Sequence, residues 1–158
     1  LAQGCDTLIT SGAVQSNHVR MTAAAAARHG MVCHGVIFGS APDRPQGNLV
    51  LDDLLGQVSH EVAGRDDVPA EVTRVSDQLS SSGRAPYVIP GGGSSAIGAQ
   101  GYVVAADEVR AAFETEPLLV CAVGTAGTFA GLVAGSGRYA DVMGVDVKAV
   151  PGIDAIIT

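Results

Sequence analysis

A chain of 158 residues, of which 47% are hydrophobic, is long enough to bury a core and too apolar to be disordered. Its net charge of −7 argues against nucleic acid and against an anionic membrane surface as partners, because both select clustered Lys and Arg. No apolar run reaches the length of about 20 residues that a membrane-spanning helix needs, so no membrane partner is expected.

Short apolar runs alternate with helical patterns along the whole chain. The runs that predict strands lie at residues 7–9, 31–38, 58–62, 87–89, 118–123 and 142–147. The patterns that predict helices lie at residues 16–29, 47–55, 66–80, 97–113 and from the 124–128 loop to about residue 135. This alternation, with continuous apolar strands, is typical of an α/β fold whose parallel sheets are covered by helices on both faces.

Polar side chains gather at the start of the first predicted helix. A small-residue turn at residues 11–13 leads to Gln15, Ser16, Asn17 and His18. The first backbone N–H groups of a helix have no intrahelical partner and attract anions, so this turn suits a carboxylate or phosphate. The alternative is that Ser16 only caps the helix and its neighbours are surface residues.

A second strand-to-helix turn, GTAGT at residues 124–128, has the same construction. Its glycines allow close backbone approach to a phosphate, and its threonines add hydroxyl donors. It is neither a Walker loop nor a dinucleotide fingerprint, since no Lys follows and the spacing differs. The alternative is a tight turn that needs glycine. The glycine- and serine-rich stretch 90–95 is a third possible anion nest or a hinge between subdomains.

Other reactive residue types are sparse. Cys5, Cys33 and Cys121 lie in or beside apolar runs without a CxxC pair, so we expect reduced, buried thiols and no metal site. Lys148 is the sole lysine of the sequence and is expected to be a solvated surface residue.

Four stretches resemble, in the same order, the D-cysteine desulfhydrases and 1-aminocyclopropane-1-carboxylate (ACC) deaminases: TLITSGAVQSNHVRMTAAAAARHGM, GNLVLDDLLG, PYVIPGGGSSAIGAQGYVVAADEV and VGTAGTFAG. These are pyridoxal-phosphate (PLP) enzymes of the tryptophan synthase β-like fold. The resemblance covers residues 4–147. It implies parallel twisted sheets flanked by helices, present here in incomplete form, with residues 1–85 in the smaller domain and 86–158 in the larger, phosphate-binding one.

The resemblance also implies roles for individual residues. Asn17 would hydrogen-bond the ring oxygen of PLP, and Ser16 could take part in proton transfer. The residues that would hold the PLP phosphate are Gly124, Thr125, Ala126, Gly127 and Thr128. The residues that would receive the substrate carboxylate are Ser16, Asn17 and His18. Phe129 departs from the family, in which a polar residue is common at that position.

The activity that the resemblance implies is that of a PLP-dependent lyase or deaminase for a small amino acid. D-cysteine is the first expectation, with β-elimination to pyruvate, ammonia and sulfide, and deamination of ACC is the alternative. Such an enzyme is expected to be cytoplasmic and, when full length, a homodimer. The family's Schiff-base lysine lies upstream of the matching start, so the chain is expected to be an internal fragment that is inactive alone. The remaining alternatives are a non-catalytic phosphate-ligand-binding remnant and an α/β domain whose glycine loops only form turns.

Overall fold

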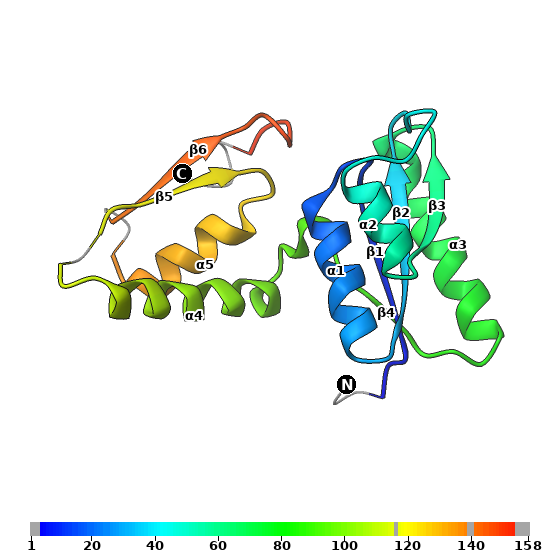
Figure 1. Ribbon diagram of the computed structural model, residues 1–158, viewed down its shortest axis with the longest axis horizontal. Helices are drawn as coiled ribbons and strands as arrows, with labels where there is room; N and C mark the ends of the chain where they lie inside the picture. The colour runs from blue at the N-terminus through cyan, green and yellow to red at the C-terminus, as the bar shows by residue number, and fades with distance from the viewer. Residues whose placement is uncertain (1–3, 116, 139–140, 154–158) are drawn as a thin grey trace. The chain divides into compact units, whose positions relative to one another are not determined.

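The computed structural model describes residues 4–115, 117–138 and 141–153 (Figure 1). The chain divides into two compact units, Leu1–Gly91 and Gly92–Thr158. The sequence placed the division after residue 85. The structure places it after Gly91, because strand β4 (Pro86–Val88) pairs with strand β1 (Thr7–Ala13) and so belongs to the first unit.

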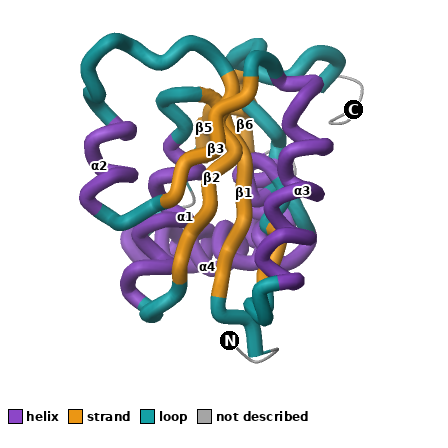
Figure 2. The backbone as a smooth tube through the Cα atoms, turned by 90° about the vertical axis from the view of Figure 1, so that its right-hand side faces the viewer, coloured by secondary structure: helices purple, strands orange, loops and turns teal. Residues whose placement is uncertain are grey.

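The first unit is a four-stranded parallel sheet with the order β3-β2-β1-β4. Strand β2 (Val32–Phe38) pairs with β1 along its whole length, from Thr7 opposite Val32 to Ala13 opposite Phe38, and with β3 (Val58–Val62) on its other side. Helices α1 (Asn17–Arg28) and α2 (Asn48–Leu54) lie on one face, and α3 (Val68–Ser81), preceded by the short helix η1 (Arg65–Asp67), lies on the other (Figure 2). The predicted α/β architecture is confirmed here.

Strand β1 is longer than the sequence predicted, and this lengthening positions the site. Residues 11–13 were expected to form a turn, but they continue β1 opposite Val36, Ile37 and Phe38. A small residue is needed there because α1 starts immediately above the strand: a Cβ atom on Gly12 would lie 2.5 Å from Ser16 Oγ. Gly12 therefore reflects close strand-to-helix packing rather than a turn.

The core of the first unit is aliphatic, as its composition requires. Ile9, Val19, Val36 and Val75 are fully or almost fully buried between the sheet and its helices. The alanine run of α1 lets that helix approach the sheet closely, and Ala23 packs in a cluster with Ala26 and Cys33. Glycine in the left-handed region ends the helix, since Gly30 has φ +67°.

The second unit contains α4 (Ala96–Ala112), β5 (Leu119–Val123), α5 (Gly127–Ser136) and β6 (Val142–Asp146). Strands β5 and β6 pair in parallel, and Val123, Phe129, Val142 and Ile153 form the core. Helices α4 and α5 pack closely because α5 carries glycine at the contact. A Cβ atom on Gly131 would lie 2.5 Å from Tyr102 Cβ.

In the described part of the second unit, a helix covers one face of the β5–β6 pair and the other face is exposed. One face of the β5–β6 pair packs on α5, whereas Val120, Met143 and Val145 on the other face are at least half exposed. The strands consequently alternate between covered and exposed positions. No helix in the described ranges is both long and apolar enough to cross a membrane.

Candidate functional site

The start of α1 leaves backbone donors available at the carboxyl end of β1. Ser16 is the N-cap residue, and its Oγ accepts a hydrogen bond from Val19 N at 3.3 Å. Asn17 and His18 are the first two helical residues, so their N–H groups have no intrahelical acceptor. Ligands of open parallel sheets bind at this end of the strands. The structure thus has the helix start that the sequence predicted, with Ser16 as its cap, whereas anion binding there stays a prediction.

The tautomer of His18 follows from its hydrogen bonds. Thr10 Oγ1 lies 3.0 Å from the Ile89 carbonyl oxygen and 2.7 Å from His18 Nε2. A carbonyl only accepts, so the Thr10 hydroxyl donates to Ile89, and His18 Nε2–H must donate to Thr10. Burial lowers the pKa of His18, which keeps the ring neutral near pH 7. The His18 ring is therefore occupied in fixing the turn, and the backbone N–H of His18 is the group that an anion there could reach.

A loop hydrogen-bond network surrounds the Asn17 side chain. Asn48, the first residue of α2, donates from Nδ2 to the Gln15 carbonyl oxygen at 2.9 Å and to Asn17 Oδ1 at 3.0 Å. Gln15 Oε1 accepts from the Asn48 backbone N–H at 2.9 Å, and Gln15 Nε2 donates to the Gln46 carbonyl at 3.0 Å. The segment before α2 is thereby fastened to the segment before α1.

The glycine- and threonine-rich loop of the second unit forms a backbone nest. Ala126 is the N-cap residue of α5 and has φ +65°, a left-handed conformation that is uncommon outside glycine. No side-chain cap is found at this helix end among the described residues, so the N–H groups of Gly127 and Thr128 remain without an intrahelical acceptor. Consecutive N–H groups around a left-handed residue are a known arrangement for binding phosphate.

The stretch that precedes α4 packs directly on this loop. Ser94 Oγ donates to Thr125 Oγ1 at 2.6 Å, which leaves the Thr125 hydroxyl hydrogen for another acceptor. A Cβ atom on Gly127 would lie 2.8 Å from Ser94 Oγ, so glycine is required for this approach. Gly92, at φ +72°, would clash with Thr125 if it carried a Cβ atom. Because no charged side chain belongs to residues 124–128, an anion would be held by neutral donors.

Two further residue types that often serve in catalysis, a cysteine thiol and a lysine amine, are poorly placed for it here. Burial raises the pKa of the Cys33 thiol to about 12, so it is no nucleophile at neutral pH. Lys148 is exposed and hydrogen-bonded to Asp146, as expected for a surface lysine. Within the described ranges, no cluster of three or more His, Cys, Asp or Glu residues could hold a metal ion.

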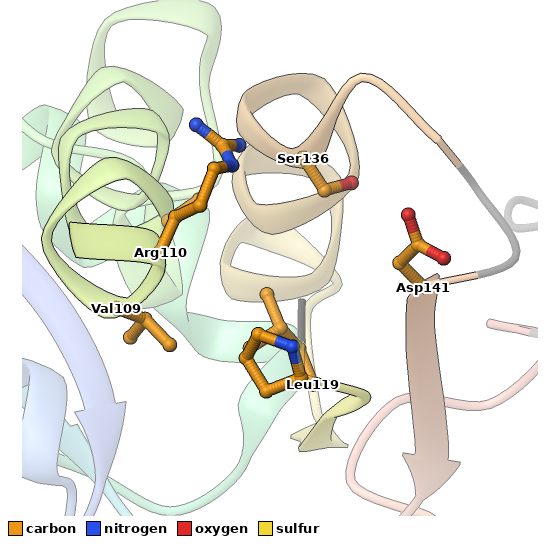
Figure 3. Close-up of a pocket in the computed structure, with 7 residues that line it drawn as sticks. Val109, Arg110, Leu119, Ser136 and Asp141 are labelled. Atoms are coloured by element: carbon orange, nitrogen blue, oxygen red, sulfur yellow. The ribbon is translucent and has the colours of Figure 1, made fainter. Parts of the chain in front are cut away.

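A pocket in the second unit lies away from residues 124–128. Its lining includes Arg110, Leu119, Ser136 and Asp141, at the amino-terminal ends of β5 and β6 (Figure 3). Residues 124–128 lie beyond the opposite end of β5. The Arg110 guanidinium is already bonded to Asp107 and to the Gly135 carbonyl. This pocket therefore offers few free polar groups, and we assign it no ligand.

Comparison with known proteins identifies the class. The model of the pyridoxal-phosphate dependent enzyme family matches residues 1–157, so the chain belongs to that family, whose cofactor is PLP as predicted. Among curated relatives, the D-cysteine desulfhydrase of Klebsiella pneumoniae is 39% identical over 94% of this chain and 48% of its own length. That of Salmonella paratyphi B is 42% identical over 85% of this chain and 44% of its own length.

Solved structures agree on the fold. A crystal structure described as an ACC deaminase homologue matches with a TM-score of 0.82 and 35% identity, over 92% of this chain and 46% of its own. A cysteine synthase of Entamoeba histolytica, at 17% identity and a TM-score of 0.61, shares the fold alone. The predicted fold class and family are confirmed. The chain spans about half the length of the relatives it matches.

Three residues with roles in this geometry were not predicted. Thr10 directly follows the strand predicted at residues 7–9, Asn48 lies at the start of the helix predicted at residues 47–55, and Ser94 belongs to the stretch 90–95, and none of the three was given a role of its own. Their contacts join segments far apart in sequence, namely Thr10 with Ile89 and Ser94 with Thr125. Only the buried threonine in a strand and the Gly-Asn pair before a helix could have served as signals.

Proposed function

We propose that the protein to which this chain belongs is a PLP-dependent lyase that converts D-cysteine and water to pyruvate, sulfide and ammonia. The observation that carries the proposal is identity of 39% or more to proteins named D-cysteine desulfhydrase, over 85% or more of this chain. The runner-up is deamination of ACC, which is favoured by the likeness to the ACC deaminase homologue. Because the chain spans about half of these relatives, the activity is a proposal for the whole protein.

The residues of the two turns fit the cofactor and an amino-acid substrate. The backbone N–H groups of Gly127 and Thr128, with the Thr125 hydroxyl, suit a phosphate, and Ala126 shapes the nest between them. Gly124 directly follows β5, and its lack of a side chain leaves the backbone there open to close approach by such a group. The proposal therefore assigns the PLP phosphate to residues 124–128.

The turn before α1 would bind the substrate side. The Asn17 side chain is assigned to the ring oxygen of PLP, and the N–H groups of Asn17 and His18 to the substrate carboxylate. The Ser16 hydroxyl accepts from Val19 N and, within the described residues, donates to no other group, so it can hold or move a proton beside the substrate. When bound, PLP supplies the electron sink that makes carbon–hydrogen cleavage next to the amine feasible.

One required group is not supplied by these residues. Schiff-base chemistry needs a lysine, and the sole lysine of the sequence is paired with Asp146 at the surface. The proposal therefore takes that amine from outside these 158 residues and expects the isolated chain to be inactive. It further takes the full-length protein to be a cytoplasmic homodimer with a small amino acid as its ligand.

The test is turnover by the full-length gene product. D-cysteine and ACC are offered separately, and pyruvate with sulfide, or 2-oxobutyrate, is measured. Pyruvate and sulfide in equal amounts from D-cysteine, lost in Asn17→Ala, support the proposal. Turnover of ACC alone would replace it with the runner-up. Bound PLP without turnover of either amino acid would contradict both.

A further inference from the structure

We infer that Asn48 is a positioning residue that sets the polarity of the Asn17 amide, so that Asn17 presents N–H donors rather than its oxygen to the ligand. The inference rests on the proposed function, because it gives the Asn17 side chain a binding partner. It goes beyond that proposal in naming the residue that decides which end of the amide faces the cofactor.

The polarity can be derived from backbone groups, whose roles are fixed. The carbonyl oxygen of Gln15 only accepts hydrogen bonds, so the atom of Asn48 that lies 2.9 Å from it must be the NH₂ group. The same NH₂ group lies 3.0 Å from the Asn17 amide, and a donor must meet an acceptor. That end of Asn17 is therefore Oδ1, and its two Nδ2–H donors are left for a ligand.

This arrangement fits the chemistry of the ring oxygen. An ionised ring oxygen accepts hydrogen bonds, and a bond to a charged acceptor is stronger than one between neutral groups. A free asparagine amide could turn either end toward it. The Asn17 side chain is exposed, so no packing fixes its orientation. The Asn48 contact is the described interaction that chooses between the two orientations.

A purely structural role for Asn48 would not need this contact. The loop before α2 is already fastened by the Gln15 side chain, which bonds the Asn48 backbone N–H and the Gln46 carbonyl. Gly47 makes room for that side chain, since a Cβ atom on it would lie 2.5 Å from Gln15 Oε1. The second bond from Asn48 Nδ2 adds orientation of Asn17 to a loop that is held by other means.

The test uses the full-length gene product and the isosteric variant Asn48→Asp, which offers an acceptor where Asn17 Oδ1 needs a donor. The amide of Asn17 is then expected to turn its oxygen toward the cofactor. We expect PLP affinity to fall about ten-fold, as for loss of one hydrogen bond to a charged group. The pH midpoint of the visible band of bound PLP should rise, because the donor that stabilised the anionic ring oxygen is lost.

Gln46→Glu is the matched control. It adds the same charge to the same loop, and Gln46 enters the network only through its backbone carbonyl. Unfolding of the apo forms shows whether either variant loosens the fold. A midpoint shift in Asn48→Asp and in Asn17→Ala, absent in Gln46→Glu, supports the inference. If the pH midpoint of Asn48→Asp equals that of the wild type while the midpoint of Asn17→Ala is shifted, the inference is overturned. A wild-type protein that binds no PLP would instead refute the proposed function.

Discussion

The contact between Thr10 and His18 gives a sharp prediction for the variant Thr10→Val. The exchange keeps the shape of a fully buried residue and removes one hydroxyl. It leaves the Ile89 carbonyl and the His18 Nε2–H without their partner at 3.0 Å and 2.7 Å. A buried polar group left unpaired costs about 1–3 kcal/mol. His18 and Ile89 are only half-buried, so the cost for each unpaired group should lie near the lower limit of this range. We therefore expect a total loss of about 2 kcal/mol in the free energy of unfolding.

The matched control is Thr22→Val, which changes the same residue type beside the same histidine. Thr22 Oγ1 donates to the His18 carbonyl at 2.9 Å, but that carbonyl is also the acceptor of the helix's own backbone bond. No group is orphaned, so we expect a loss below about 1 kcal/mol. The assay is urea unfolding followed by circular dichroism, with hydrogen exchange to localise the effect to the first unit. Equal losses in both variants, or none in either, would refute the assigned hydrogen bonds.

Three further predictions concern packing and protonation. Gly131→Ala should destabilise the second unit by about 1–3 kcal/mol through overpacking, whereas Gly101→Ala, with open space around the new Cβ, should be neutral or stabilising in thermal melts. Burial raises the pKa of Asp52, so the folded state holds this proton more tightly than the unfolded chain does, and stability is lost as pH rises through the folded pKa. Asp52→Asn should therefore flatten this part of the curve of stability against pH. An unchanged curve would contradict the assignment. Burial lowers the pKa of both His34 and His60, so their contribution to stability is fully present above about pH 6.5 and is lost as pH falls through the folded pKa values. When both histidines are replaced by Gln, denaturation measured as a function of pH should no longer show this loss of stability at low pH.

Local signals in the sequence predicted the elements well because several of the helices have a clear cap or end signal. Ser16 caps α1 and Ser95 caps α4 through the bond that its Oγ accepts from Gly98 N, while Gly30 ends α1. The alternation of strands and helices then gave the parallel α/β class. The family-specific turns led to the family that comparison confirmed.

Packing partners could not be read from the sequence in the same way. Ile97 and Val104 are large apolar residues of α4, yet both are more than half exposed. The face that packs on α5 instead carries Ala106, set against Gly135. Close helix approach selects small residues, which a search for large apolar residues overlooks. Helix α2 likewise does not bury the residues that hydrophobicity would select, since Leu54 is exposed and Asp52 is buried.

The contacts that support the two predicted turns could not be predicted for a related reason. The sequence marked residues 16–18 and 124–128, and the structure gives each turn its donors within its own unit. The supporting contacts of Thr10, Asn48 and Ser94 depend on tertiary structure, which no local pattern encodes.

The most direct test of the central claim, that residues 124–128 bind the phosphate of PLP, is a binding measurement on the full-length gene product. PLP affinity is measured by visible absorbance for the wild type, for Gly127→Asp and for Gly101→Asp. The account predicts that Gly127→Asp weakens binding at least about ten-fold, because it places a carboxylate in the nest and a Cβ atom 2.8 Å from Ser94 Oγ. The control Gly101→Asp, at a helix position with open space, should bind like the wild type. Equal affinity of Gly127→Asp and wild type would contradict the claim.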